Sequence, residues 1–91
     1  MSILKNKFLR NKDIAWRAVE DEALLVHPRK GKVYPLNPVG LRLWQLSEGA
    51  LTGEEIVQKL LAEFEVKEEE LAQDISEFAN QLKSEGLLLI Q

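Results

Sequence analysis

The alternation of apolar and polar residues changes along the chain, and its first part predicts three short β-strands. Residues 14–19 alternate with a period of two, residues 23–27 are apolar on both faces, and residues 32–36 form a third run. Polar turns at residues 20–22 and 28–31 separate these runs. Three strands joined by two tight turns predict an antiparallel meander, and the apolar middle strand is expected to be covered rather than exposed.

Helical spacing replaces the alternation in the second half of the chain and predicts three helices. They are expected over residues 38–47, 53–64 and 68–84, each with its apolar residues on one side. Thr52 and Glu55 have the spacing of a capping box at the start of the second helix. Strands followed by helices predict an α+β domain: a three-stranded antiparallel sheet followed by three helices, in a winged-helix-like arrangement.

The segment Lys-Val-Tyr-Pro-Leu-Asn-Pro-Val-Gly-Leu-Arg-Leu-Trp, residues 32–44, joins the third strand to the first helix. Asn37 is expected to cap that helix, with Pro38 at its first position. Gly40 falls in the first helical turn, where glycine costs about 1 kcal/mol relative to alanine, so a neighbouring group is expected to pack closely against it. Pro35 cannot donate a backbone hydrogen bond, which indicates that the third strand is an edge.

The two ends of the chain lack a clear period. Residues 1–12 mix apolar and basic residues and are expected to form a loosely packed tail, which leaves residues 13–91 as the domain. Residues 87–90 are apolar and are expected either to add a short strand or to cover the core. No apolar run reaches membrane-spanning length or resembles a signal peptide, so we expect a cytoplasmic protein without a membrane partner.

Composition and charge narrow the classes of function. The 91 residues include no cysteine, which excludes disulfides, thiol nucleophiles and thiolate metal sites. The formal net charge of −3 is unevenly distributed: residues 1–46 hold nine Lys/Arg and four Asp/Glu, whereas residues 47–91 hold three and eleven. An acidic second half repels polyanions and attracts a basic peptide.

Residues able to support chemistry form no recognisable catalytic or metal site. His27 is the only histidine, and no serine lies in a nucleophile motif. Glu68, Glu69 and Glu70 are consecutive, so on a helix they point in different directions instead of converging on one ion. We therefore expect no enzyme activity, no cofactor and no metal.

A winged-helix regulator that binds DNA is the leading alternative from another class, and a small structural interaction domain is a third. In a helix-turn-helix the third helix would enter the groove of DNA. Residues 67–85 hold two lysines against five glutamates and one aspartate. Contacts to phosphates dominate DNA affinity, so this acidic helix disfavours a nucleic-acid partner.

The order and spacing of many residues between Ile14 and Leu88 resemble the PqqD family of pyrroloquinoline quinone (PQQ) biosynthesis. That family is the free-standing form of a peptide recognition element found in pathways that modify ribosomally made peptides. The residues that carry the resemblance are Val33–Gly40, Leu43–Trp44, Glu48–Gly49, Thr52, Glu55–Ile56, Phe64–Val66, Asp74–Ile75, Phe78 and Gly86–Leu87.

The resemblance implies a non-catalytic peptide chaperone. It would bind the leader segment of a precursor peptide and present it to a modifying enzyme, often a radical S-adenosylmethionine (SAM) protein, in the synthesis of PQQ or of a related modified peptide. The leader would add as a strand beside the third strand, with its side chains in a groove against the third helix. The protein is expected to be a monomer. The expected peptide-binding residues are Lys32, Val33, Tyr34, Pro35, Leu36, Leu71, Asp74, Ile75 and Phe78.

Two of these residues give the expectation a more specific form. If the backbone nitrogen of Pro35 faces the open edge, the N–H of Val33 faces the same way. Proline has no N–H to donate, so leader pairing is expected to centre on Val33. Asp74 interrupts the apolar side of the third helix, where a basic leader residue would suit its carboxylate. For Ile75 and Phe78, ordinary core packing is the alternative to a role in binding.

Overall fold

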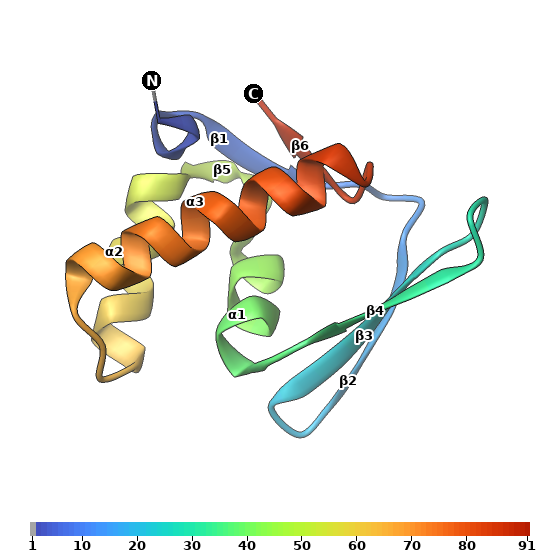
Figure 1. Ribbon diagram of the computed structural model, residues 1–91, viewed down its shortest axis with the longest axis horizontal. Coiled ribbons are helices and arrows are strands. Elements are labelled where there is room, and N and C mark those ends of the chain that lie inside the picture. Colours follow the sequence, from blue (N-terminus) through green and yellow to red (C-terminus); the bar gives the residue numbers. More distant parts are fainter. Residues whose placement is uncertain (1) are drawn as a thin grey trace.

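The computed structural model describes residues 2–91 and contains two three-stranded antiparallel sheets and three α-helices (Figure 1). In chain order the elements are η1 (a 3-10 helix, Ile3–Lys5), β1 (Lys7–Arg10), β2 (Ala15–Val19), β3 (Glu22–His27), β4 (Lys32–Leu36), α1 (Pro38–Leu46), β5 (Glu48–Thr52), α2 (Gly53–Glu63), α3 (Glu68–Ser84) and β6 (Leu88–Ile90). The expected α+β class, with a three-stranded antiparallel sheet followed by three helices, is confirmed, and the arrangement is compatible with a winged helix.

The first sheet is the predicted meander, with strand order β2-β3-β4. Residues paired across antiparallel strands share a face of the sheet. The inner face therefore carries Ala23, Leu25 and Leu36, which are buried against the helical half of the molecule. The outer face, which we define as Ala15, Arg17, Val19, Glu22, Leu24, Val26, Val33 and Pro35, is exposed.

Side-chain caps fix the starts of the first two helices as the sequence predicts. Asn37 Oδ1 accepts a hydrogen bond from the backbone N–H of Gly40 at 2.7 Å, and Pro38 occupies the first position of α1. At α2, Thr52 Oγ1 accepts from the N–H of Glu55 at 3.2 Å while the Glu55 carboxylate accepts from the N–H of Thr52 at 2.9 Å. This reciprocal capping box satisfies two backbone donors that the helix itself leaves unpaired.

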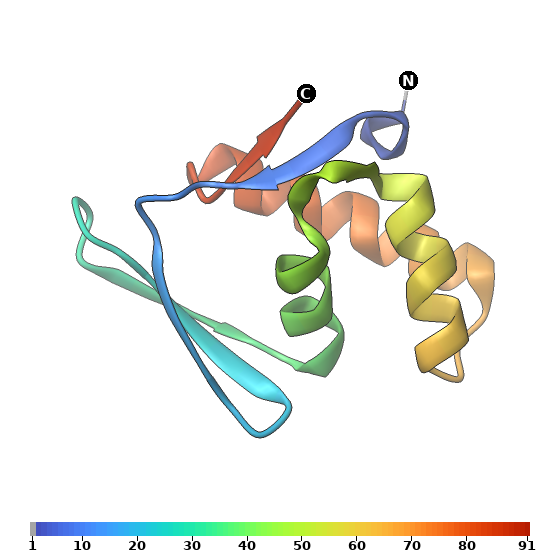
Figure 2. The same cartoon turned by 180° about the vertical axis from the view of Figure 1, so that it is seen from behind.

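The second sheet, with order β5-β1-β6, overturns the expectation that residues 1–12 form a loosely packed tail. β1 is its central strand, and Figure 2 shows β1 and β6 side by side at the two ends of the chain. Phe8 on β1 is completely buried. At the start of α2, a Cβ placed on Gly53 would lie 2.7 Å from Phe8 Cζ, so the chain needs a glycine there to admit the ring.

Arg10, at the end of β1, ties this sheet to the rest of the domain. Its Nη1 donates to the carbonyl oxygens of Trp44 and Gln45 at 3.1 Å each, at the C-terminal end of α1. Its guanidinium also lies 5.6 Å from the ring centroid of Trp16 on β2, a cation–π contact. One side chain therefore joins both sheets and the first helix.

One core lies between the sheets and the helices. α1 contacts α2, β3 and β4, and α2 packs against α3. The largest fully buried apolar side chains of this core are Trp44, Phe8, Leu25, Leu43, Ile56, Leu60, Ile75, Leu87 and Leu88. Among the helices of residues 2–91, none is long and apolar enough to cross a membrane.

We expect Phe8→Ala to lower the free energy of unfolding by about 3–5 kcal/mol, because it empties a fully buried aromatic site. Leu89→Ala, on the neighbouring strand β6 where the side chain is 47% exposed, is the matched control and should cost less than about 1 kcal/mol. Urea unfolding measures both variants. An equally small change for Phe8→Ala would show that β1 does not belong to the core.

Candidate functional site

A groove runs between the edge strand β4, with the start of α1, and the facing side of α3. Its larger hollow, about 570 Å³, lies at the N-terminal end of α3. Leu71 and Ile75, both buried, line it from α3, and Leu36 lines it from β4. The other lining residues are Glu22, Pro35, Asn37, Val39, Gly40, Val66, Glu70, Asp74 and Phe78.

Phe78 also lines a second hollow of about 430 Å³ nearer the C-terminal end of α3. Pro35, Leu36 and Phe78 line both hollows, so the two form one groove along β4. A Cβ on Gly40 would lie 3.1 Å from Phe78 Cε2. The close approach that Gly40 predicts is thus made by the half-buried Phe78 ring.

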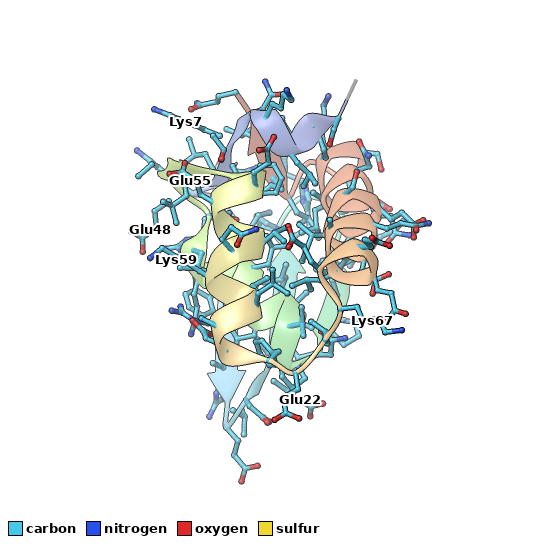
Figure 3. The ribbon with its side chains drawn as sticks, turned by 90° about the vertical axis from the view of Figure 1, so that its left-hand side faces the viewer. Lys7, Glu22, Glu48, Glu55, Lys59 and Lys67 are labelled. Atoms are coloured by element: carbon cyan, nitrogen blue, oxygen red, sulfur yellow. The ribbon has the colours of Figure 1, made fainter. Side chains whose placement is uncertain are left out.

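The two ends of the groove differ in charge. Glu22, Glu70 and Asp74 line the larger hollow, and all three are exposed. Glu70 and Asp74 lie one helical turn apart on α3, so their carboxylates share one side of the helix. Figure 3 shows Glu22 and Lys67 in the lower half of the view and Lys7 near the top. Val66, in the loop that precedes α3, also lines this acidic hollow.

A small polar network closes the other end of the groove. Lys30 Nζ lies 3.2 Å from Glu85 Oε2, and the Tyr34 hydroxyl donates to the same oxygen at 3.2 Å. The hydrogen bond from Lys30, then that from Tyr34, hold the pKa of the Glu85 carboxyl below its usual value. The pKa of the Tyr34 phenol is raised, mainly by burial and to a smaller extent by the nearby Glu85.

The nine residues predicted from the sequence all lie on β4 or α3, but they do not all reach the groove. Tyr34 and Leu36 point to the inner face, and Leu71, Asp74, Ile75 and Phe78 line the groove from α3. Lys32 and Val33 line neither hollow, although Val33 belongs to the outer face. Ile75, which is 1% exposed, belongs to the core and to the groove floor at once.

Several groove residues are not in the predicted set. Glu70 could have been found from its spacing of four residues before Asp74. Glu22 and Val66 carry no such signal, because only the folded chain brings β3 and the loop before α3 to the same hollow.

The backbone edge of β4 is open. The strand pairs with β3 on one side, and no described strand pairs on its other side. In the register of β3 and β4, Val33 faces Val26 and Pro35 faces Leu24. Antiparallel pairs alternate between hydrogen-bonded and non-hydrogen-bonded, so these two pairs are of one kind. Pro35 has no N–H to donate to β3, so the fewest hydrogen bonds between β3 and β4 are lost if both pairs are of the non-hydrogen-bonded kind. In that arrangement the N–H of Val33 points to the open edge.

His27 lies outside the groove lining. Its Nδ1 accepts hydrogen bonds from the backbone N–H groups of Arg29 and Lys30 at 3.3 Å each. The only histidine thus helps to shape the turn between β3 and β4.

The comparisons with known proteins identify the family of this fold. The model of the PqqD family, coenzyme PQQ synthesis protein D, matches residues 22–88. The chain belongs to the PqqD family. The match includes β3, β4 and all three helices, and therefore both walls of the groove.

Two solved structures are similar to this member of the PqqD family. TbiB1 in complex with the TbiA(beta) leader peptide is 30% identical, with a TM-score of 0.78 over 88% of this chain and 93% of that chain. The heterocyclase TruD is 18% identical, with a TM-score of 0.63 over 94% of this chain but only 12% of that chain, so the likeness concerns the fold of a small part of it. A search of curated proteins gives no match.

The Lys30–Glu85–Tyr34 network makes a prediction about titration. Lys30→Met should raise the pKa of Glu85 more than Tyr34→Phe does, because Lys30 is the larger cause of its lowering. Glu85→Gln should lower the pKa of Tyr34 only in part, because burial is the larger cause there. The pKa of Glu85 is lower in the folded chain, so its stabilising effect is present above the pKa of the unfolded chain and is lost as pH falls through the folded pKa. NMR titration of the Glu85 carboxyl carbon and of the Tyr34 ring carbon next to the hydroxyl measures the two pKa values. An unchanged pKa of Glu85 in Lys30→Met would contradict the network.

Proposed function

We propose that the protein is a peptide chaperone that binds the leader segment of a ribosomally made precursor peptide and presents it to a modifying enzyme. The observation that carries this proposal is the open edge of β4 beside a groove whose far wall is α3. An added strand gains backbone hydrogen bonds from such an edge, and its alternate side chains enter the groove. Membership of the PqqD family and the likeness to TbiB1, whose structure contains a leader peptide, support it.

Leader pairing centres on Val33. Its N–H is the donor that β4 offers to the open edge, while Pro35 at the next equivalent position offers none. The proline also makes β4 a poor template for pairing between two edges of this kind, which fits a monomer. The remaining contacts on this wall come from Lys32, Tyr34 and Leu36.

The groove selects leader side chains by size and charge. Leu71, Ile75 and Phe78 offer an apolar surface in the larger hollow, and Asp74 stands at its rim with Glu70 and Glu22. A leader that places a bulky apolar residue in this hollow and a basic residue beside Asp74 is the best complement.

The chain acts without catalysing a reaction. The modifying enzyme supplies the chemistry, and a radical SAM protein in the cytoplasm is the partner that the family favours, in PQQ synthesis or in a related pathway. Binding of DNA is disfavoured by α3, whose first turn exposes Glu68, Glu69 and Glu70.

Asp74→Asn is expected to weaken leader binding by about 3- to 10-fold, because it removes the carboxylate that meets a basic leader residue. Glu77→Gln makes the same change of charge on α3 at a position outside the groove, and should leave the affinity within twofold. Fluorescence anisotropy with the leader of the precursor encoded beside this gene measures both. The difference between the variants should shrink at high salt. Equal affinities for Asp74→Asn and wild type would exclude Asp74 from the site.

A further inference from the structure

The outer face of the first sheet is apolar and uncovered. Its exposed side chains include Val19 at 62%, Val33 at 54%, Leu24 at 50% and Val26 at 37%. The register makes them neighbours, because Ala15, Val26 and Val33 form one row across the three strands and Arg17, Leu24 and Pro35 form the next. Contiguous exposed apolar surface of this kind marks an interaction site.

This exposure contradicts what the sequence of β3 predicts. A strand that is apolar on both faces is expected to be covered on both. Ala23 and Leu25 are buried on the inner face, whereas Leu24 and Val26 on the outer face are open. The helices and the second sheet lie on the other side of the strands, so no described element covers the outer face (Figures 1 and 2).

The position of the outer face relates it to the leader edge. Val33 and Pro35 belong to the outer face and to the leader edge: their side chains lie on the outer face, and their backbone is part of the open edge of β4. A leader strand added to β4 would extend the sheet by one strand. Its side chains alternate, so those that do not enter the groove would extend the outer face.

The charges indicate what kind of surface is complementary. Arg17 lies in the row of Leu24 and Pro35, and Glu22 lies beside Val19 on the same face. Neither forms a salt bridge with any residue from 2 to 91. A surface that covers this face is therefore apolar, with a carboxylate opposite Arg17 and a cation opposite Glu22. A second copy of the chain would bring the same net charge of −3, so the two copies would repel each other.

We propose that the outer face docks the modifying enzyme, and that the enzyme contacts the module and the outward side chains of the bound leader together. This inference rests on the proposed function. It makes binding of the two partners cooperative: the leader strengthens enzyme binding, and the enzyme strengthens leader binding by the same factor.

The test uses the full chain, the leader and the modifying enzyme encoded beside this gene. The double variant Leu24→Gln with Val26→Thr changes two exposed residues on the central strand, away from the leader edge and groove. It should weaken enzyme binding by at least about tenfold and change leader affinity less than twofold. Leu89→Gln, an equally exposed leucine on β6, is the control and should change neither affinity.

The outcomes separate this inference from the proposed function. Unchanged enzyme affinity in the double variant, or an enzyme affinity that does not respond to the leader, would overturn the docking face while leader binding stands. A wild-type dimer that the double variant dissociates, with enzyme binding intact, would assign the face to self-association and also overturn the inference. Failure of the wild type to bind the leader would overturn the proposed function itself.

Discussion

The junction at Asn37 and Pro38 is the constraint on which the functional part of the structure depends. Asn37 ends β4 and caps α1 in one step, so the strand is fixed at its C-terminal end by a helix packed in the core. The strand keeps an open edge because the chain turns away from the sheet at that point instead of adding another strand. Leu36 is buried there while Val33 remains exposed, and β4 is thus anchored at one end and available along its edge.

The opposite wall of the groove depends on contacts made far along the chain. α3 is held by Leu71, Ile75, Ala79 and Leu82, all buried, and by packing against α2. Gly40 lets α3 lie close to α1, because its missing side chain leaves room for the Phe78 ring. The network of Lys30, Tyr34 and Glu85 ties the turn between β3 and β4 to the end of α3. The groove is therefore bounded at one end by polar contacts and lined by carboxylates at the other.

Local signals in the sequence predicted much of this architecture. The caps at Asn37 and Thr52 mark the starts of two helices through bonds to near neighbours, and the structure confirms them. A short strand was one of the two expectations for residues 87–90, and β6 confirms it. Its partners β1 and β5 were missed because their pairing is non-local: Phe8 pairs with Ile90, and a short strand without clear alternation carries no signal of its own. The resemblance to the PqqD family predicted β4 and α3 as the groove walls, whereas Glu22 and Val66 were not predicted because only the folded chain brings them to the same hollow. The apolar residues of β3 predicted a covered strand, but the fold covers only one side.

The central claim is that β4 pairs with a leader strand, and an amide-resolved titration of the isotope-labelled protein with the leader encoded beside its gene tests it most directly. The account predicts saturable shifts that cluster along residues 32–36 and 71–78, with new protection of the Val33 amide from hydrogen exchange in the complex. Saturable shifts confined to the basic strands on addition of duplex DNA, with none from the leader, would contradict it.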